Sequence, residues 1–207
     1  MNMEWLTIIK DISLIIVACI GSIVAIIGLN TWKAEQRGRV AFELARNLLA
    51  NTYRLRDQVS NLRAPFMSAA EMKNPPDDSP FVKTEKGKHF YRQYSGYERR
   101  LTPIDETLKK IFVDLAEAEA LWGSNIRREY NKLFSIINKL VIEIHMYLDQ
   151  LNPEKPMFQY KLDYEDNMKR VKIMFGTGSE KDEYARKVDG AIKSIENCIQ
   201  PHLQKQK

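Results

Sequence analysis

The chain has 207 residues, of which 44% are hydrophobic and 29% are charged, so it can build a folded core and is not a disordered or low-complexity polymer. Two Cys and three His exclude a disulfide scaffold, a four-Cys zinc site and His-rich metal chemistry. The net charge of +5 arises with acidic residues interspersed among the basic ones, so it predicts no nucleic-acid partner.

Residues 12–32 read ISLIIVACIGSIVAIIGLNTW and carry no charge. As a helix, these 21 residues would extend about 31 Å, which matches the hydrocarbon thickness of a bilayer. Trp5 and Trp32 flank the stretch, as interfacial aromatic residues do. The pattern predicts an N-terminal segment, residues 1–32, with a transmembrane helix at about 12–32, followed by a separate domain over residues 33–207.

The charges beside the apolar stretch predict its orientation. Lys33, Arg37 and Arg39 follow the stretch, whereas Lys10 precedes it together with acidic residues. Because basic flanks favour the cytoplasmic side, we expect a single-pass protein with its amino terminus outside and its C-terminal domain in the cytoplasm.

A signal peptide and a lipoprotein anchor are the two alternatives to a transmembrane helix for the apolar stretch. A cleaved signal peptide needs positive charge at its start and a small-residue cleavage site, and neither is clear here. The segment Ile16–Cys19 resembles a lipoprotein processing box, which would leave Cys19 lipidated and send the domain to the far side of the membrane. However, residues 20–29 remain apolar where a mature lipoprotein turns polar, so a transmembrane helix accounts better for the pattern.

Small side chains gather on one face of the expected span, namely Ala18, Gly21, Ser22, Ala25 and Gly28. Their spacing includes pairs of the small-xxx-small form, which lets helix backbones approach closely. This face is a candidate contact with a second copy or another membrane protein, although such pairs also arise from the composition of membrane helices alone.

After Gly38 the apolar residues alternate spacings of three and four, which is the heptad pattern of coiled-coil helices. Four such seams run over residues 41–66, 101–122, 126–151 and 184–203. With one short and two longer connections, they predict an all-α fold in which one N-terminal transmembrane helix is followed by an antiparallel four-helix bundle.

Turn and cap residues predict where these helices begin and end. The first seam stops near Pro65, and Pro103 either starts the second helix or kinks a longer one that begins near Lys86. Ser124 and Ser179 are the expected N-caps of the third and fourth helices.

The connection over residues 152–178 is long for a compact bundle, and such connections often carry function. It holds the aromatic residues Phe158, Tyr160 and Tyr164. We therefore expect it, together with the loop over residues 73–85, to contact a protein partner.

An up-down-up-down bundle would return to the membrane after its second helix. This topology would gather Lys33, Arg37, Arg39, Arg127 and Arg128 at the membrane-proximal end. Arg127 and Arg128 fall in the first turn of a helix, where the dipole disfavours positive charge, and anionic headgroups would offset this cost by about 1 kcal/mol for each residue. The five residues are candidate headgroup contacts, and an ordinary solvated basic surface is the alternative.

Few residues suggest catalysis. No Glu-x-x-His motif occurs, which argues against a carboxylate-bridged metal centre. Cys198 and His202 lie four residues apart, but a core thiol and a residue favoured at a helix carboxyl end explain them better than a catalytic pair does. Glu117 and Glu119 are expected to make ion pairs with Arg46 or Arg54 across the bundle. We therefore expect no enzymatic activity, cofactor, metal ion or small-molecule ligand.

Three short motifs, WKAEQRG at residues 32–38, EAEALWG at 117–123 and PHL at 201–203, resemble those of a group of bacterial single-span membrane proteins that have no assigned activity. The resemblance implies a bacterial inner-membrane protein with a cytoplasmic helical domain. It adds no catalytic residues.

Together these patterns predict a membrane-anchored helical bundle that acts through protein–protein contacts, as a scaffold, sensor or accessory subunit. Its expected partners are membrane lipid and either another protein or further copies of itself. The alternative is a membrane-perturbing effector, such as a phage-type or defence-type toxin, that oligomerises through its single span.

Overall fold

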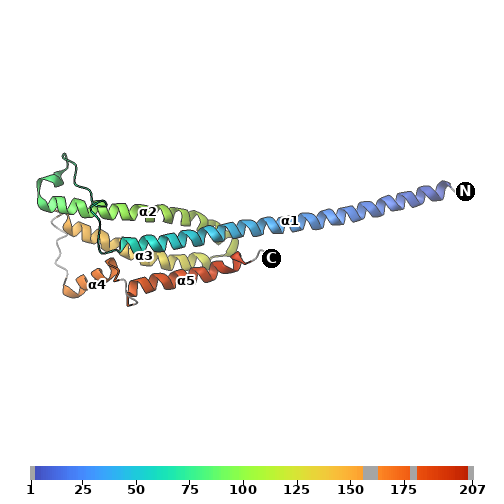
Figure 1. The fold of residues 1–207 in the computed structure, drawn as a ribbon. Helices are drawn as coiled ribbons and strands as arrows, with labels where there is room; N and C mark the ends of the chain where they lie inside the picture. The colour runs from blue at the N-terminus through green and yellow to red at the C-terminus, as the bar shows by residue number, and fades with distance from the viewer. Residues whose placement is uncertain (1–2, 156–162, 178–180, 205–207) are drawn as a thin grey trace.

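The computed structural model describes residues 3–155, 163–177 and 181–204, with side chains from residue 14 onward except at 15 and 18. Over these residues every regular element is a helix (Figure 1). The elements are α1 (Met3–Leu62), the 3-10 helix η1 (Pro80–Lys83), α2 (Glu85–Trp122), α3 (Asn125–Leu151), α4 (Tyr164–Met174) and α5 (Glu183–Leu203). The prediction of an all-α fold is confirmed.

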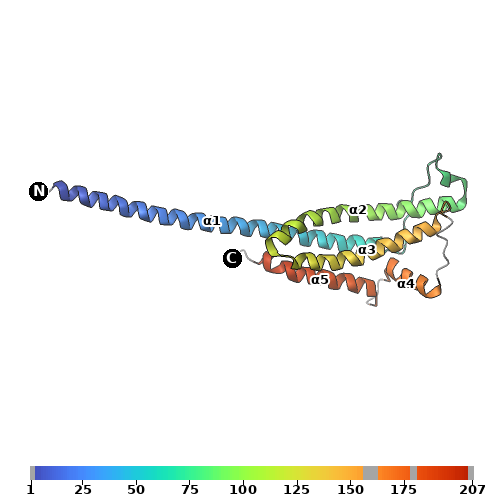
Figure 2. The ribbon, with the colours of Figure 1, turned by 180° about the vertical axis from the view of Figure 1, so that it is seen from behind.

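Four of the helices enclose one core. The carboxyl-terminal half of α1 contacts α2 and α5, and α3 contacts the same two helices, so each member of the ring has two neighbours. Successive members run in opposite directions, as Figures 1 and 2 show from two sides. Figure 2 also shows the amino-terminal half of α1 extending away from this bundle as a single helix.

The core follows the predicted seams. Its fully buried large side chains come from all four helices of the ring, and they include Leu48, Leu55, Ile104, Ile111, Leu115, Leu133, Leu140, Ile144 and Ile195. Burying one such side chain stabilises a fold by about 1.5–3 kcal/mol. Within this core the Tyr130 hydroxyl lies 2.7 Å from Thr52 Oγ1, which donates to Leu48 O at 2.8 Å. These buried hydroxyls are therefore satisfied.

The first helix of the bundle ends where proline predicts. α1 stops at Leu62, and Pro65 follows three residues later. The expectation that Phe66 continues the core seam is wrong, since its side chain is 87% exposed. The chain has already left the helix there, so the heptad phase no longer decides which way the side chain points.

α2 is the longer helix that was expected to begin near Lys86, and not one that starts at Pro103. It begins at Glu85, where Thr84 Oγ1 accepts a hydrogen bond from Gly87 N at 3.0 Å, and Pro103 lies in its interior. It ends at Gly123, whose φ of 87° is a conformation that glycine adopts without strain. This turn lets α3 start almost immediately and run antiparallel to α2.

The predicted N-caps need correction. Ser124 occupies the N-cap position of α3, but its side chain makes no capping hydrogen bond. α5 begins at Glu183 and its N-cap is Asp182, so the prediction of Ser179 was wrong. Ser179 itself lies outside the described residues. The difference matters because Asp182 also belongs to a buried ion pair, described below.

α4 lies within the long connection over residues 152–178, where no helix was predicted. Asp163 caps it, accepting a hydrogen bond from Asp166 N at 2.8 Å. Of its eleven residues, only Arg170 and Met174 are buried. The helix therefore lies on the bundle surface rather than in the ring.

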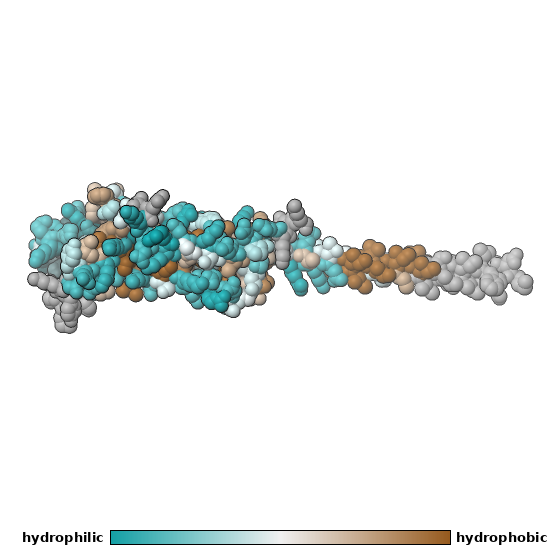
Figure 3. All heavy atoms as spheres, turned by 90° about the horizontal axis from the view of Figure 1, so that it is seen from below, coloured by the Kyte–Doolittle hydropathy of each residue, from teal (hydrophilic) through white to brown (hydrophobic). Residues whose placement is uncertain are grey.

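The amino-terminal half of α1 exposes apolar side chains. Figure 3 shows a hydrophobic surface over this helix where it projects beyond the bundle. Val17, Val24 and Ile26 are each more than 60% exposed there.

Within the described part of the chain, none of the helices combines the length and the mean hydropathy of a membrane span.

Candidate functional site

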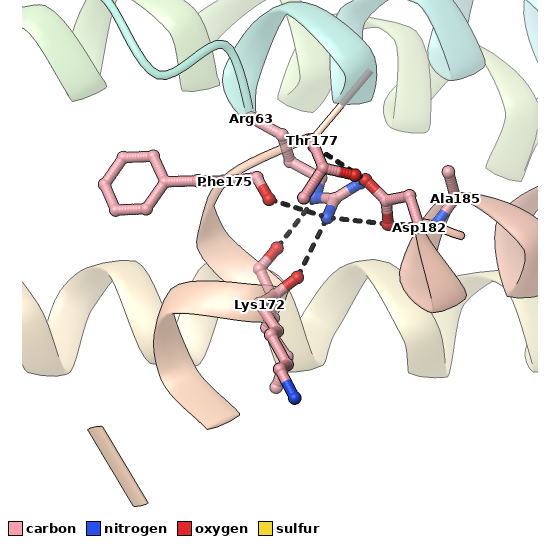
Figure 4. Close-up of polar contacts among 7 residues, drawn as sticks. Arg63, Lys172, Phe175, Thr177, Asp182 and Ala185 are labelled. Atoms are coloured by element: carbon pink, nitrogen blue, oxygen red, sulfur yellow. Dashed lines mark hydrogen bonds and ion pairs between the residues drawn. The ribbon is translucent and has the colours of Figure 1, made fainter. Parts of the chain in front are cut away.

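A buried arginine joins three helices where α1 ends and α5 begins (Figure 4). Arg63 directly follows α1, and only 5% of its side chain is exposed. Its Nη1 lies 3.0 Å from Asp182 Oδ2, and its Nη2 donates to Asp182 Oδ1 at 3.0 Å. The pair is bidentate, which is the arrangement in which a guanidinium matches a carboxylate best.

The same guanidinium also terminates α4. Arg63 Nε donates to Ile173 O at 2.7 Å, and Nη2 donates to Lys172 O at 3.0 Å and to Phe175 O at 3.1 Å (Figure 4). Because the last carbonyls of a helix lack intrahelical partners and carry partial negative charge, the guanidinium acts as a cap. We call Arg63, Asp182 and these three carbonyls the Arg63 clasp.

Asp182 connects the Arg63 clasp to α5. Its Oδ1 accepts from Ala185 N at 3.0 Å as the N-cap, and its Oδ2 accepts from Thr177 N at 3.2 Å. Burial favours a higher pKa, but the hydrogen bonds from Arg63 and the two backbone amides outweigh it and hold the pKa of Asp182 below its ordinary value. One ion pair therefore closes the end of α4 and the start of α5, and fixes both to α1.

A second buried arginine holds the loop that follows α1. Arg100, on α2, donates from Nε to Glu71 Oε2 at 2.5 Å. It also donates to Ala64 O at 2.9 Å and to Phe66 O at 2.7 Å. The hydrogen bond from Arg100 is the main cause that lowers the pKa of Glu71 to about 2.

A third buried arginine attaches α4 to α3. Arg170 donates from Nε to Glu143 Oε2 at 3.1 Å and from Nη1 to Gln150 Oε1 at 2.7 Å. In Arg63, Arg100 and Arg170 alike, the donors are directed at groups of the protein itself. These guanidinium groups thus hold loops and α4 in place.

The turn between α2 and α3 packs against the carboxyl end of α5. The rings of Trp122 and His202 stack, with their centroids 4.1 Å apart and their planes 8° from parallel. Glu119 pairs with Arg127 at 2.6 Å, so the prediction that it pairs with Arg46 or Arg54 was wrong. Arg127 reaches Glu119 because the tight turn places the first turn of α3 beside the last turn of α2.

The candidate headgroup residues fall into two groups. Lys33, Arg37 and Arg39 lie on the exposed part of α1, outside the bundle. Arg127 is half-buried in its ion pair, and Arg128 is exposed with its Nε 3.7 Å from Glu129 Oε1. The carboxylates of Glu119 and Glu129 thus offset the cost of positive charge at the start of α3.

The candidate contact face of the span lies on the projecting part of α1. Gly21, Ser22, Ala25 and Gly28 are exposed there, and the Ala18 side chain lies outside the described residues. Nothing lies within 4 Å of the point where a Cβ would stand at Gly21 or Gly28. The bundle therefore leaves this side of α1 uncovered.

The expected partner loop is described only in part. Phe158 and Tyr160 lie outside the described residues. Tyr164 is 79% exposed, but it is the first residue of α4, so the prediction that it belongs to a loop was wrong. The sequence did contain the signal for this helix, because Asp163 is an N-cap residue followed by acidic residues in the first turn.

Cys198 and His202, which were weighed as a catalytic pair, both make contacts that hold the fold together. Asn125 Nδ2 donates to Cys198 Sγ at 3.4 Å, and burial, with a contribution from Glu129, raises the pKa of the Cys198 thiol. A thiol in these surroundings is less reactive than a thiolate. No group of three or more His, Cys, Asp or Glu able to hold a metal ion occurs in the described segments.

No protein-family model, curated protein or solved structure is significantly similar to this chain. A functional assignment therefore depends on the sequence pattern and the geometry described above.

Proposed function

We propose that this protein is a membrane-anchored helical bundle that acts through protein–protein contacts, as a scaffold, sensor or accessory subunit without catalytic activity. The observation that carries the proposal is the apolar part of α1, which has no charge over residues 12–32 and continues into the helix that enters the bundle. Exposed apolar surface of this extent is normally covered by lipid or by another protein.

The flanking charges support an inner-membrane location with the amino terminus outside. Lys33, Arg37 and Arg39 follow the apolar stretch on the exposed helix, where anionic headgroups would attract them. We call residues 33–43 the stalk, since Leu44 is the first side chain of α1 that the bundle buries. The motifs that resemble bacterial single-span membrane proteins agree with this location.

By helical rise, the candidate headgroup residues fall into two groups at different distances from Trp32. With Trp32 at the membrane interface, the start of the core at Leu44 lies about 18 Å away along α1, at ~1.5 Å per residue. Tyr130 is level with Thr52, so Arg127 and Arg128 lie about 25 Å from Trp32 by the same rise. The headgroup layer is only about 5–8 Å deep on each side. By the same rise Lys33, Arg37 and Arg39 lie about 2, 8 and 11 Å beyond Trp32, near enough for their long side chains to reach this layer. We therefore propose these three as the headgroup contacts and leave Arg127 and Arg128 out.

The proposed partner surface is the outer side of α4. Tyr164, Met168 and Val171 recur at four- and three-residue spacing, which puts them on one face, and each is at least 37% exposed. A short apolar stripe of this kind suits a protein contact.

Gentle detergent extraction of the tagged full chain from its membrane, followed by mass spectrometry, tests the proposal. We expect the chain in the membrane fraction with a stoichiometric partner, and we expect Tyr164→Ala to reduce recovery of that partner. Tyr94→Ala, which removes another partly exposed aromatic ring, serves as the matched control. Recovery of the chain in the soluble fraction without detergent would contradict the anchoring.

The alternative, a membrane-perturbing effector, draws support from the position of the small residues. Successive residues of a helix are turned by about 100°, so Gly21, Ala25 and Gly28 point roughly opposite to the face that α1 buries in the bundle. That buried face contains Leu48, Leu55 and Val59. Copies could therefore associate through the span while their bundles point away from each other.

Growth arrest and dye entry on expression would favour this alternative. Both effects should disappear in the Gly21→Leu/Ala25→Leu variant, because larger side chains prevent close approach of the helices. Ile26→Leu, on the other side of the same helix, should leave them unchanged. Silent overexpression of the intact chain would argue against the alternative.

A further inference from the structure

α4 is attached to the bundle unequally along its length. Among the described helices it stands outside the ring of four, and its principal helix contact is with α3. Its two buried residues, Arg170 and Met174, both lie in its carboxyl-terminal half, and Tyr164–Lys169 are exposed. The packing therefore becomes stronger from the start of the helix to its end.

The carboxyl-terminal end is fixed by the Arg63 clasp. Three carbonyls from Lys172 to Phe175 accept from the guanidinium, and Gly176 N donates back to Arg63 O at 2.8 Å. To detach this end, the chain would have to leave a buried charge without its partners, which is strongly destabilising. This end stays in place unless the bundle itself opens.

Among the described residues, Arg170 is the side chain that ties α4 to α3 by polar contacts, and the polar side chains before it bond within α4 or with its N-cap. Asp163 and Asp166 bond within α4 itself, and Lys169 pairs with Asp166 on the same helix. The side-chain connection to α3 is made by Arg170, with Glu143 and Gln150. Arg170 is 5% exposed, like Arg63, but its partner Glu143 is 22% exposed against 6% for Asp182, so water already reaches the carboxylate of this pair. Opening here costs less than opening at the clasp.

We propose that α4 is a flap that pivots on the Arg63 clasp, with its amino-terminal half swinging away from α3 while its carboxyl-terminal end stays attached. Movement of this kind uses the least stable contacts of a fold, which is where conformational changes normally begin. Opening moves the stripe of Tyr164, Met168 and Val171 and uncovers the side of α3 that carries Glu143. The flap does not depend on membrane attachment or on a partner.

Distances between pairs of spin labels on the full chain in detergent test the flap. Cys19 and Cys198 are first replaced by Ala, and labels are attached at Lys139→Cys on α3 and at either Glu165→Cys or Lys172→Cys on α4, all of which are exposed positions. We expect a broader distance distribution for the Glu165 pair than for the Lys172 pair, because only the former reports on the swinging end.

Variants of the connection to α3 separate a flap from a rigid helix. Arg170→Gln and, from the other side, Glu143→Gln should shift the Glu165 pair to longer distances and leave the Lys172 pair unchanged. Lys169→Gln is the matched control, since its partner lies on α4 itself, and unfolding temperatures check that the bundle remains intact. Equal widths for both pairs, or equal shifts of both pairs in Arg170→Gln, would overturn the proposal.

Discussion

Arg63, Arg100 and Arg170 show how single side chains organise the part of the bundle where helices give way to loops. Each has at most 5% of its side chain exposed, and each binds a carboxylate. Arg63 and Arg100 also bind loop carbonyls. Loops have few apolar side chains to bury, so the planar fork of a guanidinium, with its five donors, replaces a core there.

Acid should weaken the loop that Arg100 holds. The pKa of Glu71 is about 2 in the folded chain against an ordinary value of 4.5. A carboxyl with a lowered pKa contributes stability that is present above its unfolded pKa and is lost as the pH falls through its folded pKa. The free energy of unfolding, measured with denaturant, should therefore fall between about pH 5 and pH 2. The pKa of Asp182 is also lowered, so its protonation should reduce stability as the pH falls in the same way.

Glu71→Gln isolates this contribution. The variant should be less stable than the parent chain at neutral pH, and its stability should depend less steeply on pH in the acid range. Parallel pH profiles for the two proteins would contradict the role given to the pair of Glu71 and Arg100.

The hydrogen bond between the buried hydroxyls of Tyr130 and Thr52 should contribute only modestly to the free energy of unfolding. Tyr130→Phe removes a hydrogen bond to Thr52, but Thr52 keeps its bond to Leu48 O, so no donor of Thr52 loses its partner. We expect a loss of about 0.5–1.5 kcal/mol in the free energy of unfolding. Tyr164→Phe, whose ring is 79% exposed, should change it by much less. Equal losses in the two variants would show that the bond contributes nothing.

At the scale of elements, the heptad seams predicted the long helices well because each seam is buried along most of its length. α3 is the clearest case, since Ile126, Tyr130, Leu133, Ile137 and Ile144 are all in the core. α4 was missed because only two of its residues are buried, so it has no seam to detect. The first part of α2 was uncertain because Gly87, Gly96 and Arg100 stand at buried positions there.

The Arg63 clasp could not be predicted from the sequence, for a related reason. Arg63 lies one residue after the last seam position of α1, and an arginine in a sequence is normally exposed. Its partners are backbone carbonyls more than 100 residues away, and a carbonyl has no sequence signature. Asp182 could be recognised as a cap, but its pairing with Arg63 requires the fold. The small-residue face of α1 and the basic residues Lys33, Arg37 and Arg39, by contrast, are local in sequence and were predicted as candidates.

Replacing either of two helical glycines by alanine should change the free energy of unfolding in opposite directions. A Cβ at Gly87 would stand 2.5 Å from Phe81 O, a backbone atom of η1, whereas nothing lies within 4 Å of that position at Gly190. Gly87→Ala should therefore lower the free energy of unfolding by about 1–3 kcal/mol. Gly190→Ala should raise it by about 0.5–1 kcal/mol, because alanine favours the helix. Denaturant unfolding of both variants checks the pair, and stabilisation by Gly87→Ala would contradict the close approach of η1 to α2.

At the scale of the whole molecule, α1 serves two parts of the protein with one uninterrupted helix. At ~1.5 Å per residue its 60 residues extend about 90 Å, from the apolar stretch through the stalk to the end of the core. In the proposed orientation, the stalk determines how far the bundle stands from the bilayer.

Quenching by brominated lipids measures this separation. A chain in which Trp32 is the remaining tryptophan, made by Trp5→Phe and Trp122→Phe, should be quenched strongly. A chain that keeps only Trp122 should be quenched weakly, because the bundle begins about 18 Å from the interface by helical rise. Unfolding curves of both variants confirm that they are folded. Equal quenching would contradict either the stalk or the anchoring.

The continuity of α1 also limits how a stimulus at the membrane could reach the bundle. Sliding α1 by one turn, about 5.4 Å, would move every interdigitated side chain, including Leu48, Leu55 and Val59, out of its place among the neighbouring helices. Tilting residues 33–40 of the stalk disturbs none of these contacts, because these residues lie outside the bundle and Gly38 has open space around it. If α1 is anchored as proposed, a stimulus at the membrane would thus reach the bundle as a change in the tilt of the stalk and not as a shift of α1 along its axis.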